Sequence, residues 1–191
     1  MSIFKKDKEE QNRIRLRNLL KNTQQSCPTG WEREFFAVGG LTEVGFSKEH
    51  PEMLLIVSSQ GRGIIDCNKL EKIERDNDVT GDWINENEFW CLGLGATGNE
   101  KIQIAGLHGG GLNFSNKEGD SIEFFAPNWP IINLIFQPNF LSIYEESETS
   151  KCFNILNDYE PRAYGFSPNG QIFVTATGGD VTVYRKEIVF Q

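Results

Sequence analysis

One pattern of short strands and turns occurs near both ends of this chain. The first copy starts at residues 44–47 (VGFS), continues through an apolar run within 51–59 and reaches a glycine turn followed by 63–66 (GIID). The second starts at 164–167 (YGFS) and continues through 171–177 to 181–184 (VTVY). Each copy predicts three short strands joined by a Pro-bearing turn and a glycine turn, the pattern of stacked antiparallel meanders.

The composition also favours a mainly β protein. The 191 residues include 14 Phe, 4 Trp and 19 Gly, and aromatic side chains fill pleated surfaces while glycine permits tight turns. The length is enough for one main domain, and we expect residues 28–191 to form a single β domain.

Residues 1–27 predict an N-terminal helical segment. Residues 3–22 contain no Gly or Pro and carry a thin apolar stripe that includes Ile3, Phe4, Leu16, Leu19 and Leu20. The run 27–30 (CPTG) ends the helix. The helix is expected either to pack on the domain as a peripheral element or to act as a docking or dimerisation element.

The middle of the chain fits the same template more loosely. It predicts strands at 91–94, 101–105, 112–114 and 121–125, and a shorter unit with strands at 133–136, 141–144 and 151–156. The short apolar run at 54–57 is typical of a strand buried on both faces. The first strands of the four units then lie 47, 42 and 30 residues apart, close to the repeat of a four-stranded propeller blade.

Residues 165–170 (GFSPNG), the β-branched strand after them and the Gly-Asp turn before 181–184 resemble a WD-repeat blade. The resemblance covers 162–186, and 43–75 is similar to a variant of the same blade. It implies a β-propeller built of such blades.

The two chain ends supply a reason for sheet closure. The last unit stops after its third strand, near Tyr184, while an extra strand at 34–38 precedes the first unit. Pairing them would complete a sheet and cover two open edges. We therefore expect a small β-propeller-like array of about four units, with a β-sandwich or a partly open barrel as the alternative.

Charge and cysteine usage exclude several classes of function. The net charge of −8 disfavours nucleic acid and anionic membrane surfaces as partners, although residues 1–24 carry seven Lys or Arg against three acids. That basic segment could contact the acidic remainder of the chain or an acidic partner. No apolar run is long enough to span a membrane, and Cys27, Cys67, Cys91 and Cys152 are too dispersed for a metal knuckle. A cytoplasmic protein with reduced thiols and no cofactor is expected.

Catalytic motifs are weak. Residues 108–111 (HGGG) match a string that forms part of the oxyanion hole in some esterases and lipases, but the chain has no G-x-S-x-G nucleophile. A glycine-rich turn is the simpler interpretation of this string. No catalytic residue and no metal ligand is assigned.

The predicted connecting loops carry side chains that suit protein recognition, because exposed Trp, Tyr and Arg concentrate binding energy. The candidate binding residues are Trp83, Trp129, Tyr159, Arg162, Arg62, His108 and Asp180. Both tryptophans could instead be core residues. The first hypothesis is a non-enzymatic module that binds a protein or peptide, with an immunity or antitoxin-like protein acting on a basic partner as one concrete form. The alternative is a hydrolase or carbohydrate-binding protein with a site around His108.

Overall fold

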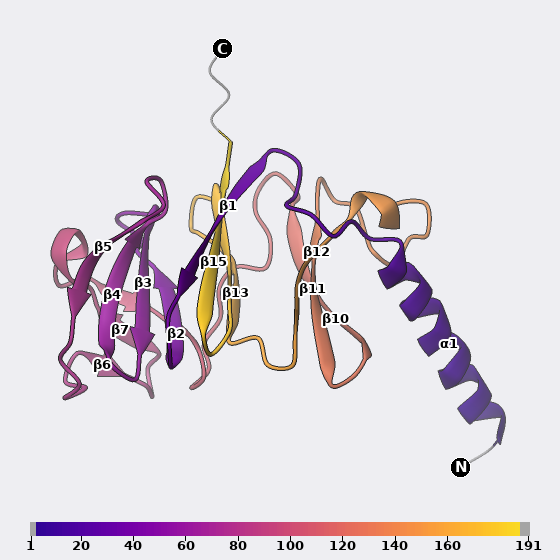
Figure 1. Cartoon of the computed structure of the whole chain (residues 1–191), viewed down its shortest axis with the longest axis horizontal. Coiled ribbons are helices and arrows are strands. Elements are labelled where there is room, and N and C mark those ends of the chain that lie inside the picture. The colour runs from indigo at the N-terminus through magenta and orange to yellow at the C-terminus, as the bar shows by residue number, and fades with distance from the viewer. Residues whose placement is uncertain (1–2, 188–191) are drawn as a thin grey trace. The chain divides into compact units, whose positions relative to one another are not determined.

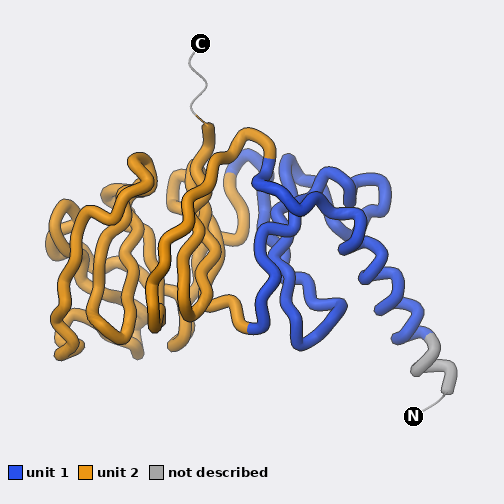
Figure 2. The backbone as a smooth tube through the Cα atoms, in the orientation of Figure 1, with its two compact units in different colours: residues 1–28, 117–159 blue, residues 29–116, 160–191 orange. Residues whose placement is uncertain are grey.

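A computed structural model describes residues 3–187, with side chains from residue 8 onward (Figure 1). The side chains of Ile3 and Phe4 therefore lie outside the described part. The chain divides into two compact units, unit 1 (residues 1–28 and 117–159) and unit 2 (residues 29–116 and 160–191) (Figure 2). The protein is mainly β, as the sequence predicts, and within the described residues all four sheets are antiparallel.

Unit 1 contains the N-terminal helix and a three-stranded sheet. The elements are α1 (Ile3–Lys21), β10 (Ser121–Asn128), β11 (Ile131–Gln137), η2 (Thr149–Lys151) and β12 (Phe153–Asp158). The strands follow the order β10-β11-β12. Because Leu16, Leu19 and Leu20 are three and four residues apart, they share one face of α1 and pack into a cluster with Phe125 and Ile135. The predicted helix is confirmed, and its described apolar face packs on unit 1.

Unit 2 contains three sheets. We name them the end sheet, the middle sheet and the short sheet, because the middle sheet packs between the other two. The end sheet has the order β1-β15-β14-β13, the middle sheet β5-β4-β3-β2-β9, and the short sheet β6-β7-β8. Their bounds are β1 Trp31–Ala37, β2 Leu41–Phe46, β3 Met53–Ser58, β4 Gly61–Asp66, β5 Glu71–Asp76, β6 Ile84–Asn85, β7 Trp90–Leu92, β8 Lys101–Gln103, β9 Ala105–Gly106, β13 Ala163–Phe166, β14 Ile172–Ala176 and β15 Asp180–Lys186; the 3₁₀ turn η1 is Gly95–Thr97.

Strands β3 and β4 of the middle sheet are buried on both faces. Leu54 and Ile56 of β3 join a cluster with residues of the end sheet such as Val174 and Val183. The alternate residues Leu55 and Val57 join a second cluster with residues of and beside the short sheet. Successive side chains of a strand point to opposite faces, so the continuous apolar run of β3 fits a layer covered on both sides. The prediction for residues 54–57 is confirmed.

The pairing of the two chain ends is also confirmed. Strand β1 lies antiparallel to β15, with Glu34 opposite Val183 and Phe35 opposite Thr182. The end sheet is therefore a four-stranded meander whose fourth strand comes from near the start of the chain. Both terminal copies of the repeated pattern form their three predicted strands, β2 to β4 and β13 to β15.

Two predicted strands are wrong. Residues 112–114 form only a single bridge, Asn113 to Phe166. Leu112 crosses closely over β13 at Gly165, where a side chain would collide with it. Residues 141–144 form a turn, in which the Gln137 side chain accepts from the Ile143 amide and Thr149 Oγ1 donates to the Ile143 carbonyl. Side chains thus replace a strand partner for this buried backbone.

The assignment of residues 121–125 to a middle unit is a further error. This strand, β10, pairs with β11 in unit 1 rather than with the strands at 91–103. Strand β5, with the sequence EKIERD, was not predicted because its side chains are mainly charged and exposed. It lies at one edge of the middle sheet, where charge protects against pairing with other chains.

The β1 to β15 pairing gives a stability prediction. Val183→Ala should lower the free energy of unfolding by about 2 kcal/mol, because it removes two methyl groups from a fully buried site and leaves a cavity. Urea denaturation would measure the change.

Thr182→Ala is the matched control on the same strand. Its partner Phe35 is 59% exposed, so this face of the pair borders solvent, and we expect a change within about 0.5 kcal/mol. Equal effects of the two substitutions would contradict the described orientation of β15.

Candidate functional site

The seven predicted binding residues are divided between the two units. Trp129 and Tyr159 belong to unit 1, and both are largely exposed, at 73% and 68%. Arg62, Trp83, His108, Arg162 and Asp180 belong to unit 2. Most of these five side chains contact other residues of unit 2.

Arg62 and Trp83 form an internal pair. Trp83 is 7% exposed, and the Arg62 guanidinium lies 5.0 Å from the centre of its ring. Arg62 also donates to Asp76 Oδ2 at 3.1 Å and to the Leu92 carbonyl at 2.6 Å. Of the two interpretations of the tryptophans, the core one holds for Trp83, so its indole ring is not part of an exposed surface.

Arg162 and Asp180 contact residues beside them in turns. Asp180 accepts a hydrogen bond from the Thr177 hydroxyl at 2.8 Å, across the turn between β14 and β15. Arg162 lies 3.3 Å from the Glu160 carboxylate, and its backbone amide donates to the Ala176 carbonyl. These contacts hold the ends of the end sheet.

His108 lies between two carboxylates. Its Nδ1 is 2.6 Å from Glu43 Oε1, and its Nε2 is 3.4 Å from Glu86 Oε1. The Glu43 side chain is only 1% exposed, and its Oε2 has no hydrogen-bond partner among the described residues. Burying a carboxylate is costly, so the imidazole is its principal stabilising contact.

The glycines after His108 form a tight turn. Gly106 and Gly109 exchange two backbone hydrogen bonds, at 2.9 and 3.2 Å, and Gly109 and Gly110 adopt positive φ angles of 123° and 76°. Side chains are disfavoured at such angles, which explains the glycine run. The Gly109 amide is engaged within this turn.

Cys91 is close enough to Arg62 and Glu43 for both to affect its titration. Burial is the main cause that raises the pKa of its thiol to about 11. A thiol with that pKa is protonated near neutral pH, so Cys91 is a poor nucleophile. Among the side chains that the structure describes, residues 8–187, no group of three His, Cys, Asp or Glu is placed to hold a metal ion.

A hollow of about 380 Å³ lies in unit 1 beside α1. We call it the Trp129 groove; it is lined by Glu9, Asn12, Arg13, Leu16, Arg17, Ala126, Pro127 and Trp129. Trp129 and Pro130 are the two residues between β10 and β11, and the peptide bond that joins them is cis. The indole therefore stands at the tip of a hairpin, beyond the last paired residues of both strands.

The groove combines apolar and cationic side chains. Leu16 and Pro127 belong to its lining, and Arg13 and Arg17 lie one helical turn apart on α1. Arg17 donates to the Asn128 side chain at 2.9 Å, which links the helix to the end of β10. Arg13 lies 3.5 Å from Glu10, and both side chains of that pair are more than half exposed.

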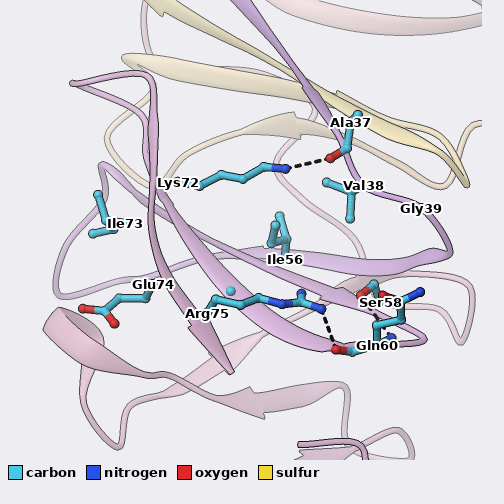
Figure 3. A pocket seen from close by; sticks show the side chains of 11 residues that line it. Ala37, Val38, Gly39, Ile56, Ser58, Gln60, Lys72, Ile73, Glu74 and Arg75 are labelled. Atoms are coloured by element: carbon cyan, nitrogen blue, oxygen red, sulfur yellow. Dashed lines mark hydrogen bonds between the residues drawn. The ribbon is translucent and has the colours of Figure 1, made fainter. Parts of the chain in front are cut away.

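A second hollow, of about 360 Å³, lies in unit 2. We call it the β5 pocket; its lining residues are Ala37, Val38, Gly39, Ile56, Ser58, Gln60, Gly63, Lys72, Ile73, Glu74 and Arg75 (Figure 3). His108 lines neither hollow. The β5 pocket was not predicted because β5, its charged edge strand, has no apolar pattern. The arginines of the Trp129 groove were not predicted either, although a pair at positions 13 and 17 on a predicted helix was a usable signal.

The sequence matches no protein-family model and no curated protein. The structure contains no helix that is both long and apolar enough to cross a membrane, among the residues it describes.

The His108 contact gives a second prediction. His108→Ala should lower the free energy of unfolding at pH 7 by about 2 to 3 kcal/mol, because it leaves the Glu43 carboxylate buried without its closest partner. Chemical denaturation would measure this.

Adding Glu43→Gln to His108→Ala should recover part of that loss, since a buried neutral amide costs less than a buried charge. The prediction would fail if the double variant were no more stable than His108→Ala alone.

Proposed function

We propose that this protein is a non-enzymatic binding module, and that unit 1 recognises a segment of another protein at the Trp129 groove. The single observation that carries the proposal is Trp129 itself, 73% exposed at the edge of a hollow of about 380 Å³. An exposed tryptophan beside a hollow offers a partner a large contact area at a small cost in conformational entropy. Tryptophan is for this reason one of the residue types enriched in binding hot spots.

The charges of the groove favour an acidic segment as the partner. Arg13 and Arg17 line the groove together with one acid, Glu9, and both also lie within 4 Å of the exposed Glu10. Arginine suits carboxylates because its planar group donates two parallel hydrogen bonds. Although the chain as a whole has a charge of −8, residues 1–24 carry seven Lys or Arg against three acids, and this segment would attract a partner of the opposite sign.

The proposal includes a propeller-like arrangement and a reducing compartment. The end sheet and the strands β2 to β5 are each four-stranded meanders, which supports the resemblance to WD-repeat blades. Within residues 3–187 the four cysteines form no disulfide and three of them are buried, which is consistent with the cytoplasm.

Selection from a random peptide library displayed on phage, with the full chain as bait, tests the groove. We expect enriched peptides to combine Asp or Glu with an apolar side chain, and Trp129→Ala to weaken their binding at least tenfold, about 1.4 kcal/mol. Isothermal titration calorimetry on the enriched peptides would measure this.

Phe140→Ala is the matched control, because Phe140 is an 82% exposed aromatic residue of unit 1 that does not line the groove. Its peptide affinity should match that of the unmodified protein. Peptides that bind the Trp129→Ala variant with unchanged affinity would overturn the proposed site.

A second function is favoured by one observation, the contact between His108 and the buried Glu43. A carboxylate that holds Nδ1 of an imidazole fixes its tautomer and leaves Nε2 to exchange protons with a substrate or water. This arrangement would serve a hydrolase or a carbohydrate-binding protein with its site at His108. Glu86, at 3.4 Å from Nε2, would then have to move to admit a substrate.

A screen with ester and glycoside substrates tests this second function. Any turnover that depends on the pair should fall at least a hundredfold in His108→Gln, while His50→Gln, the change at the other histidine, should leave it unaltered. Turnover that survives His108→Gln would remove the proposal.

A further inference from the structure

We propose that the β5 pocket of unit 2 is a binding site for a small organic anion, a carboxylate that carries a short apolar chain. The proposal is independent of the Trp129 groove, which belongs to the other unit. At about 360 Å³ the hollow falls within the usual range of small-molecule sites.

The floor of the pocket is apolar. Ile56 and Val38 are both buried members of the cluster between the middle and end sheets. Gly63 of β4 lies beside Ile56, and a Cβ added there would stand only 2.8 Å from the Glu74 carbonyl, so this glycine lets β5 approach β4 closely. An alkyl chain of a ligand would rest on the side chains of Ile56 and Val38.

Two cations stand over this floor. Lys72 and Arg75 extend from β5 on either side of Ile56, while Ile73 and Glu74 point the other way (Figure 3). Lys72 donates to the Ala37 carbonyl at 2.7 Å, and Arg75 donates to the Gln60 carbonyl at 2.5 Å. These bonds fix both side chains across the pocket, so less conformational entropy is lost when a ligand binds.

Both cations keep donors for a ligand. An ammonium group has three N–H donors and a guanidinium has five, and the described contacts use one of Lys72 and two of Arg75. Among the side chains described from residue 8 to 187, neither forms an ion pair within 4.0 Å. The nearby Asp76 carboxylate is paired with Arg62 at 3.1 Å.

The chemistry selects a carboxylate over other ligands. Two cations over an apolar floor favour an anion, and a carboxylate can accept a charge-assisted hydrogen bond from either the Lys72 ammonium or the Arg75 guanidinium. The volume allows a chain of about four to eight carbons, since such sites enclose most of their ligand. A cationic ligand would meet two like charges.

Titration of the full chain with hexanoate, followed by two-dimensional NMR of the backbone amides, tests the proposal. We expect saturable shifts confined to residues 37–39, 56–63 and 72–75. Hexanol and hexylammonium, which keep the chain and change the head group, should bind at least tenfold more weakly.

Three lysine variants and two glycine variants locate the binding. Lys72→Met should raise the dissociation constant at least tenfold and Lys72→Arg should restore it, whereas Lys48→Met makes the same charge change outside the pocket lining and should have no effect. Gly39→Phe should block the pocket, because the space above Gly39 is open and its φ is not positive. Gly111→Phe, at another open glycine outside the lining, is its control.

The absence of saturable shifts at 20 mM hexanoate, chosen as roughly twentyfold above a millimolar dissociation constant, would overturn the proposal. Equal binding of hexanol would also overturn it, because the cations would then play no part. If Gly39→Phe does not fold, the three lysine variants decide the outcome.

Discussion

The burial of β3 and β4 on both faces is the constraint on which unit 2 depends. A strand with Leu54, Leu55, Ile56 and Val57 in succession exposes apolar surface on either side, and one covering layer leaves half of it in water. The end sheet covers one face and the short sheet covers the other. The covering layers leave part of the middle sheet accessible beside β5, which is why a hollow with an apolar floor exists there.

The division of the chain into two units follows from where the segments of each unit lie in the sequence. Residues 117–159 interrupt unit 2 between β9 and β13, and they build unit 1 together with the N-terminal helix. The helix needs that insertion, because Leu16, Leu19 and Leu20 find their apolar partners, such as Phe125 and Ile143, within it. The hairpin that carries Trp129 is part of the same insertion, so the proposed groove exists only where two distant segments meet.

The sequence predicted those elements whose local pattern and tertiary role agree. The repeated strands at both ends, the helix and the pairing of Phe35 with the last strand were predictable because apolar periodicity and unpaired edges determine them. Strand β5 was not predictable, since a charged edge strand carries no apolar pattern. Residues 141–144 have the apolar pattern of a strand, but side chains rather than a neighbouring strand form hydrogen bonds with their backbone. Trp83 and Trp129 could not be told apart by composition, because the Arg62 contact that accompanies the burial of Trp83 joins strand β4 to the turn before β6.

The pairing of β1 with β15 has a consequence for how the protein is made. Strand β1 is synthesised well before β15, because the rest of unit 2 and the insertion lie between them in the sequence, so the edge of β1 must wait for its partner. The helix waits in the same way for the insertion that follows the short sheet. Unit 1 cannot fold before the insertion has left the ribosome, and unit 2 cannot be completed before β15 has. Until then the nascent chain depends on its exposed charges, or on a chaperone, to avoid aggregation.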